Sequence, residues 1–189
     1  MRRVGLRDIT IALLTADTVD TLTTYEAPTK LERSIKAQLT PKSTQVKLYS
    51  DDSVEEVINA FDSIDVEIEL NQLTIESRAI LQGATVVKGV LIEKKTDIAP
   101  TLALGFKSKK TNGKYMYVWL YKGSFSLSED TFETEEVDVK DQTAKLKATF
   151  YAREYDGAYR VIADEDATSY EVSTGTAWFD SVSEQPTAI

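Results

Sequence analysis

Asp65-Val66-Glu67-Ile68-Glu69-Leu70 is the stretch that decides the fold class of this chain. Acidic and apolar side chains alternate strictly along it, and a period of two is typical of a β-strand with one buried face and one exposed face. Asp65, Glu67 and Glu69 then share one face, for which a solvated outer surface is the simplest interpretation. The stretch therefore predicts a mainly β protein.

A tight hairpin is predicted further along the chain. Residues 114–121 (KYMYVWLY) are rich in aromatic and branched side chains, which suit a pleated surface. They follow Asn112-Gly113, a dipeptide that supplies the positive backbone φ of a two-residue turn. Residues 101–108 are the expected partner strand. Within the second strand, Trp119 suits core packing and an interface equally well.

Five further extended segments are predicted, at residues 31–39, 45–49, 137–139, 144–153 and 158–162. Pro41 separates the first two of these segments, because proline interrupts a hydrogen-bonded ladder. Asp156-Gly157 is expected to join the last two as a hairpin.

One short α-helix is predicted between Asn71, as its N-cap, and Gly83, as its C-terminal stop. Its apolar stripe is formed by Leu73, Ala79, Ile80 and Leu81. Residues 53–61 fit two structures. Ser53 and Glu56 have the spacing of a capping box, which favours a helix, whereas the resemblance described below favours a strand, and we expect the strand.

The length of 189 residues fits one domain, since domains cluster at roughly 100–200 residues. The two ends differ in composition from the middle. We expect residues 1–30 to form an N-terminal arm, residues 31–170 a β-rich domain and residues 171–189 a C-terminal arm, with both arms ordered by a partner. Trp178 and Phe179 lie in the C-terminal arm, and an exposed aromatic pair there is a candidate inter-subunit contact.

The composition argues against several function classes. The net charge is −9, and the chain has no cysteine and no histidine. An acidic balance without a basic stripe disfavours nucleic-acid binding. The missing residue types remove disulfides, thiolate or imidazole metal ligands and histidine-based nucleophile pairs. The apolar runs are too short for a membrane helix or a signal peptide, so we expect a protein made in the cytoplasm.

Two acidic clusters are candidates for chemical sites. Asp51-Asp52 and Asp164-Glu165-Asp166 are candidates for binding a hard cation, and the first pair also for acid–base chemistry. Adjacent carboxylates at a turn more commonly accept backbone hydrogen bonds, and neither cluster has the spacing of a calcium loop. We therefore predict no catalytic, metal or cofactor site, and no enzyme.

In combination, the motifs resemble the major tail protein family of siphophages, whose members are the tail-tube subunits of long non-contractile tails. Four passages carry the resemblance, in this order: Leu48-Tyr49-Ser50-Asp51-Asp52, then 61–70 (FDSIDVEIEL), then Pro100 to Phe106 (PTLALGF), and last 112–123 (NGKYMYVWLYKG). Leu81-Gln82-Gly83 also ends the helix as in that family. The order and spacing agree over residues 4–170.

The resemblance implies a fold and a function. The fold would be a β-sandwich or partial barrel with one flanking helix, and the subunits would form hexameric rings that stack into a hollow tube. Such a tube houses the tape-measure protein, meets the tail terminator and distal tail proteins at its ends, and conducts DNA without binding it specifically. The protein would belong to the virion tail and be assembled in the host cytoplasm. Asp65, Glu67 and Glu69 would line an acidic lumen.

Two alternatives remain open at this point. The chain fits another tail component of related β architecture, namely a terminator, a baseplate protein or the inner tube of a contractile system. It also fits a β-sandwich that binds a receptor or carbohydrate through Tyr115, Tyr117, Trp119 and Tyr121, although alternate members of that run must face opposite sides of the sheet.

Overall fold

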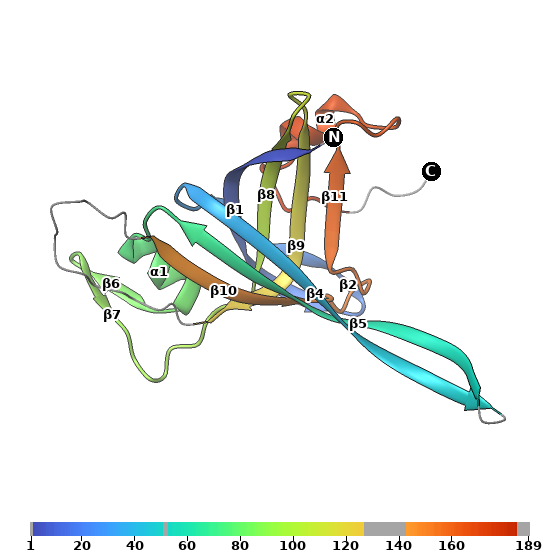
Figure 1. Cartoon of the computed structure of the whole chain (residues 1–189). Coiled ribbons are helices and arrows are strands. Elements are labelled where there is room, and N and C mark those ends of the chain that lie inside the picture. The colour runs from blue at the N-terminus through green and yellow to red at the C-terminus, as the bar shows by residue number, and fades with distance from the viewer. Residues whose placement is uncertain (1, 51–52, 127–142, 185–189) are drawn as a thin grey trace, which may run out of the picture.

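A single large antiparallel sheet dominates the computed structural model, which describes residues 2–50, 53–126 and 143–184 (Figure 1). The strands are β1 (Arg3–Thr18), β2 (Thr21–Tyr25), β3 (Thr29–Lys30), β4 (Ser34–Ser50), β5 (Ser53–Leu70), β6 (Thr85–Val87), β7 (Val90–Ile92), β8 (Leu102–Lys110), β9 (Tyr115–Phe125), β10 (Ala144–Tyr151) and β11 (Arg160–Asp164). The helices are α1 (Ile75–Gln82) and α2 (Val172–Ala177). The predicted mainly β class is confirmed.

Nine strands form the large sheet, in the order β2-β1-β8-β9-β10-β5-β4, with β3 beside β1 and β11 beside β9. Strand β9 connects the two halves of the sheet. Its first part pairs with β8 and β11, and its last residues pair with β10. The remaining strands, β6 and β7, form a separate two-stranded ribbon.

The main core lies between the inner faces of the two halves. Buried apolar side chains come from β5 and β10 on one side and from β1, β8 and β9 on the other: Ile64, Val66, Ile68, Leu70, Leu146 and Phe150 pack in one cluster with Ile9, Ile11, Leu102, Leu104 and Leu120. The alternation that predicted a strand in β5 is confirmed, because its even-numbered residues from Ile64 to Leu70 are all buried.

Strand β4 runs straight through Pro41, so the predicted break between residues 31–39 and 45–49 is wrong. Pro41 pairs with Ile64, and a register shift follows directly between Lys42 and Ser43. Proline is tolerated here because β4 is the terminal strand of the sheet and has β5 on one side only. The backbone ladder of β4 and β5 continues to Ser50, and the hairpin projects from the body of the protein (Figure 1). Residues 53–61 therefore belong to a strand, as expected.

The hairpin predicted at Asn112-Gly113 is confirmed between β8 and β9, with Gly113 at φ +87°. A second glycine, Gly123, is needed for packing instead. A Cβ there would lie 2.5 Å from the ring of Phe150 and 2.6 Å from the carbonyl oxygen of Thr149. Only glycine lets β9 and β10 approach this closely.

Helix α1 ends as predicted at Gly83, which has φ +70°, but its N-cap is Thr74 and not Asn71. The backbone N–H of Asn71 instead donates to the carbonyl of Arg33 beside the end of β5. Glu32 accepts hydrogen bonds from Thr74 and from the Ser77 hydroxyl. Burial acts to raise the pKa of the Glu32 carboxyl, but these hydrogen bonds outweigh it and hold that pKa below its ordinary value.

The prediction of an N-terminal arm over residues 1–30 is wrong for most of that segment. Strand β1 lies inside the sheet, paired with β8 from Arg3 to Leu13 and with β2 from Leu14 to Thr18. Ile9 to Ala12 are buried on both faces of the strand, so they show no alternation by which the sequence could identify them as a strand. Asp8 takes φ +54° at the register shift between Arg7 and Thr10.

The predicted hairpin at Asp156-Gly157 is right about the turn and wrong about the pairing. Gly157 has φ +70°, and its N–H donates to the carbonyl of Arg153. After this turn, however, β11 pairs with β9 and not with β10. The choice of partner strand is a long-range property that the turn residues do not encode. The strand predicted at 137–139 lies outside the described residues.

Candidate functional site

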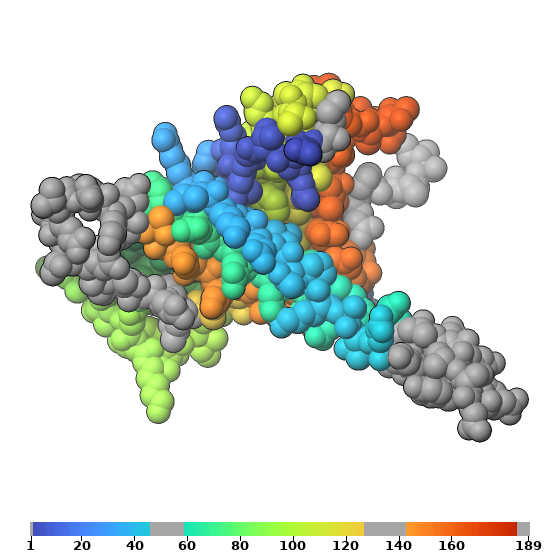
Figure 2. Space-filling view, viewed as in Figure 1, coloured from blue at the N-terminus to red at the C-terminus, as the bar shows by residue number. Residues whose placement is uncertain are grey.

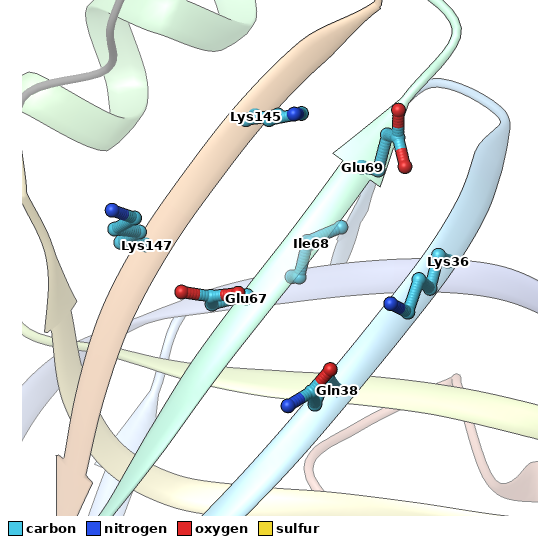
Figure 3. Close-up of a pocket in the computed structure, with 7 residues that line it drawn as sticks. All are labelled: Lys36, Gln38, Glu67, Ile68, Glu69, Lys145 and Lys147. Atoms are coloured by element: carbon cyan, nitrogen blue, oxygen red, sulfur yellow. The ribbon is translucent and has the colours of Figure 1, made fainter.

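The charged face of β4, β5 and β10 is the first candidate surface. Asp65, Glu67 and Glu69 point away from the core, as their alternation predicted, and Figure 3 shows the two glutamates on the same face as side chains from β4 and β10. The register places Thr40, Gln38 and Lys36 of β4 opposite them on one side. Thr149, Lys147 and Lys145 of β10 lie opposite them on the other side. The structure thus brings all three predicted acids together.

The lysines change the charge of this face. Four of them, Lys36, Lys42, Lys145 and Lys147, accompany the three carboxylates along the stretch opposite Ser63–Glu69. The sum for this stretch is therefore one positive charge, so this face is not the acidic wall that the sequence suggested. Local sequence could not show this, because the lysines come from strands that are distant in the chain.

Specific contacts order part of the face. Lys42 Nζ lies 2.6 Å from a carboxylate oxygen of Asp65, and the hydroxyl of Thr149 donates to the same carboxylate at 3.2 Å. The lysine holds the pKa of the Asp65 carboxyl below its ordinary value, and the carboxylate raises the pKa of Lys42 in turn. Thr143 donates to Glu69 at 2.6 Å. A shallow depression of about 160 Å³ lies between Lys36, Glu67 and Lys145 (Figure 3).

The free edge of β4 is the second candidate surface. No described strand pairs with β4 on the side away from β5. A long edge strand exposes a row of unpaired backbone N–H and C=O groups, which invite pairing with another chain. Beside this edge, an open cleft of about 400 Å³ separates the inner face of β4 from β1, β8, β9 and β11. Apolar side chains line most of it: Leu6, Leu39, Phe106, Met116, Val118 and Ile162.

The C-terminal segment forms an aromatic layer over the outer face of β9. Trp178 is only 2% exposed and lies 5.6 Å, between ring centroids, from Tyr117. The indole N–H of Trp119 donates to the carbonyl of Trp178, and the hydroxyl of Tyr121 donates to that of Ser183. Residues 172–184 are thus held by their own chain.

This packing contradicts the predicted C-terminal arm of residues 171–189 over its described part, residues 171–184, and residues 185–189 lie outside the described residues. It also contradicts the expectation that Trp178 is exposed to a neighbour. Trp178 and Phe179 contact β9 of their own chain instead, with the ring of Phe179 6.0 Å from that of Trp119. The prediction failed because the short helix α2 has no capping or periodic signal, so nothing in the sequence showed that the segment folds back.

The same layer covers the aromatic run that a carbohydrate site would use. Tyr117, Trp119 and Tyr121 are all buried, and Tyr115 alone of the run is partly exposed. A sugar-binding platform needs at least one open aromatic face. Tyr117, Trp119 and Tyr121 therefore cannot contact a sugar in the described structure, and the ring of Tyr115 has Lys107 Nζ 5.1 Å from its centroid.

Arg153 fastens the end of the C-terminal segment. Its side chain is 1% exposed, lies 4.0 Å above the ring of Tyr121, and donates two hydrogen bonds each to Asp156 and Glu184. Burial acts to lower the pKa of the guanidinium, but the two carboxylates outweigh it and raise that pKa. The group is therefore a permanent cation in the structure.

The acidic cluster at 164–166 is engaged by a lysine. Lys110 bridges Asp164 and Asp166, the latter at 2.7 Å, and its hydrogen bond lowers the pKa of Asp166 to about 2. Across residues 2–50, 53–126 and 143–184 no three or more acidic side chains are arranged so that they could hold a metal ion. Asp51-Asp52 lies outside the described residues. No described helix has the length and apolar character needed to cross a membrane.

Comparison with known proteins adds no assignment. No family model matches this sequence, and no curated protein shows significant similarity to it. The function is therefore inferred from the residues and their geometry.

Proposed function

We propose that this protein is a structural subunit that assembles with copies of itself, as the major tail-tube protein of a long non-contractile phage tail. Hexameric rings would stack into a hollow tube that houses the tape-measure protein and conducts genomic DNA. Its further partners would be the tail terminator and the distal tail proteins. Its place would be the virion tail, after assembly in the host cytoplasm.

The observation that carries the proposal is the unpaired edge of β4, which is 17 residues long. Soluble monomers blunt such edges with charge, proline or short length. Strand β4 carries Pro41 and three lysines, but its length exceeds the roughly 3–10 residues that are usual for a strand, and the edge runs on into a hairpin that projects from the body (Figure 1). Closing the sheet across subunits would satisfy these backbone groups, and head-to-tail contacts between copies propagate without limit.

The charged face fits the wall of such a tube. The sheet has one solvent-exposed face and one face packed on the core, as the wall of a tube requires. The exposed face would line the lumen, with the acids Asp65, Glu67 and Glu69 and the lysines Lys36, Lys145 and Lys147. DNA passing along it would meet a wall of interleaved charges. No specific binding follows, because no basic groove tracks a phosphate backbone there.

Negative-stain electron microscopy of the purified protein over a concentration series tests the proposal. Hollow tubes, or six-fold rings that stack as the concentration rises, are the expected result. A protein that remains monomeric, and that fails to polymerise on a supplied tail-tip complex, would contradict it. Discrete rings that never stack would favour the second candidate, a terminator or another ring-forming tail component, because a terminator stops at one ring.

A further inference from the structure

A β-bulge interrupts the pairing of β4 and β5 where their hairpin leaves the body of the protein. Lys42 pairs with Ser63, and the next residue, Ser43, pairs with Phe61, so Asp62 has no partner in this ladder. A bulge bends its strand and increases the local twist. Figure 2 shows β4 and β5, in light blue and blue-green, leaving the body toward the lower right.

The bulge also changes which side chains of β5 face the core. From Ile64 to Leu70 the even-numbered residues are buried on the inner face. With unbroken alternation, Phe61 would point outward together with Ser63 and Asp65. The extra residue reverses the alternation, and Phe61 instead packs against the main core. A bulge that re-aims a side chain in this way is a common device beside functional positions.

The re-aimed ring of Phe61 stacks on the ring of Tyr159. The two ring centroids are 3.9 Å apart, and the ring planes are inclined by 11°. Tyr159 directly precedes β11, and its carbonyl oxygen accepts a hydrogen bond from the backbone N–H of Tyr121 in β9, at 3.2 Å. The guanidinium of Arg160 lies over the same ring, 5.8 Å from its centroid. The stack therefore joins the base of the hairpin to β9, the strand that connects the two halves of the sheet.

Other described contacts hold the direction of the hairpin weakly. Strand β10 pairs with β5 only from Ile64 to Leu70, so beyond the bulge the described ladder consists of β4 and β5 alone. A two-stranded ribbon is marginally stable by itself. On the outer face, Lys42 and Asp65 form an ion pair on the body side of the bulge, and exposed ion pairs contribute little. The stack is therefore the contact best placed to fix the angle between hairpin and body.

We infer that the bulge at Asp62 is a hinge and that the stack of Phe61 on Tyr159 is the clamp that holds it in one direction. The two rings are positioning residues for the hairpin. This inference goes beyond the proposed self-assembly, and only its consequence for assembly rests on that proposal. A hairpin that samples many directions has to be ordered when subunits join, which costs conformational entropy, whereas a clamped hairpin is already ordered.

The distance between two spin labels tests the clamp within a single chain, and the native chain contains no cysteine to interfere. Ser50→Cys places one label at the far end of β4, and Lys145→Cys places the other on the exposed face of β10. The labelled chain is diluted into unlabelled chain, so that double electron–electron resonance reports distances within one chain only. We expect one narrow distance distribution when both rings are present.

Removing either ring should release the hairpin. Phe61→Ala and Tyr159→Ala should each widen the distance distribution about twofold or more, whereas Tyr159→Phe keeps the ring and should keep the narrow width. Lys42→Gln is the matched control, because it removes the ion pair on the opposite face at the same bulge, and it should also keep the narrow width. Circular dichroism checks that each variant is folded. If Phe61→Ala is not, Phe61→Leu takes its place, since it keeps an apolar side chain without a ring.

The outcomes separate the clamp from the proposed tube. Alanine variants as narrow as the parent, a parent already as wide as the alanine variants, or broadening by Lys42→Gln alone would each overturn the clamp. The widths do not depend on assembly. If they change as expected but the chain forms neither rings nor tubes, the clamp stands and the tube proposal is contradicted. If tubes form and the ring variants keep the narrow width, the clamp alone is contradicted.

Discussion

Replacing Arg153 by methionine is expected to loosen the C-terminal segment and destabilise the fold. The guanidinium is buried and makes four charge-assisted hydrogen bonds of 2.7–3.0 Å, to Asp156 and Glu184. Removing one partner of a fully buried ion pair costs about 3–5 kcal/mol. The two carboxylates are 26% and 33% exposed and regain hydration, so we expect a smaller loss of about 2–3 kcal/mol.

Urea unfolding at neutral pH measures this loss, with tryptophan fluorescence as the signal. Both tryptophans of the chain, Trp119 and Trp178, lie in the layer that Arg153 fastens. With a slope of about 2 kcal/mol per molar urea, the midpoint should fall by about 1 M. In a double-mutant cycle with Glu184→Gln, we expect a coupling free energy of about 1 kcal/mol or more. A loss below about 0.5 kcal/mol, or a coupling of zero, would refute the anchoring role of Arg153.

Three further predictions concern single positions. Gly123→Ala should cost at least about 2 kcal/mol of unfolding free energy, because the added Cβ would overlap the backbone and an aromatic ring. Gly5→Ala is the control and should cost under about 1 kcal/mol, because the atom nearest to its added Cβ is 3.8 Å away. Equal losses for the two variants would contradict the packing argument. Burial acts to raise the pKa of Asp17, but hydrogen bonds from a lysine and two backbone amides outweigh it and lower that pKa. The ionised Asp17 carboxylate therefore contributes its full stabilisation above its unfolded pKa of 3.8, and this stabilisation is lost as the pH falls through the lower pKa of the folded state. In urea titrations, the difference in unfolding free energy between wild type and Asp17→Asn should be constant from pH 5 to 7 and should vanish below about pH 4. Trp178→Ala should cost about 3–5 kcal/mol of unfolding free energy in the same assay, because it removes a buried ring. Trp178→Phe should cost under about 1.5 kcal/mol, because the indole N–H of Trp178 is buried without a described partner and no hydrogen bond is lost with it. Equal losses for the two variants would argue against this account of the indole N–H.

Local signals in the sequence predicted the elements that carry them. The alternation from Asp65 to Leu70 identified the buried and exposed faces of β5 correctly. Asn112-Gly113 identified the β8–β9 turn, and Gly83 the end of α1. Each of these signals acts within a few residues, through side-chain period or backbone φ, so one sequence suffices to read it.

The failures concern properties that local sequence does not encode. The middle of strand β1, Ile9 to Ala12, is buried on both faces, which removes the alternation that marks a strand, and arginines and an aspartate precede it, so the local sequence favours an arm. The partner of β11 and the fold-back of residues 172–184 depend on the aromatic face of β9, which is far away in the chain. The sequence showed Trp178 in a polar tail, and tertiary packing decided its burial.

The charged face is the most informative of these cases for function. The three acids of β5 suggested a repulsive wall, but the register interleaves them with lysines of β4 and β10. Directly opposite residues on neighbouring strands lie about 5 Å apart, which is within the Debye length of about 8 Å at physiological ionic strength. The fields of opposite charges therefore largely cancel before they reach a molecule a few ångströms above the sheet.

A tube lined by this face would pass DNA for a different reason than an acidic tube would. Phosphates would be neither repelled nor held, because each carboxylate has a cation beside it and each lysine a carboxylate. The chain's net charge of −9 must then reside mainly outside the stretch opposite Ser63–Glu69, since that stretch sums to one positive charge. In such a tube, the net charge would act on solubility and on contacts between subunits, whereas the local pairing of strands would set what a passing polyanion experiences.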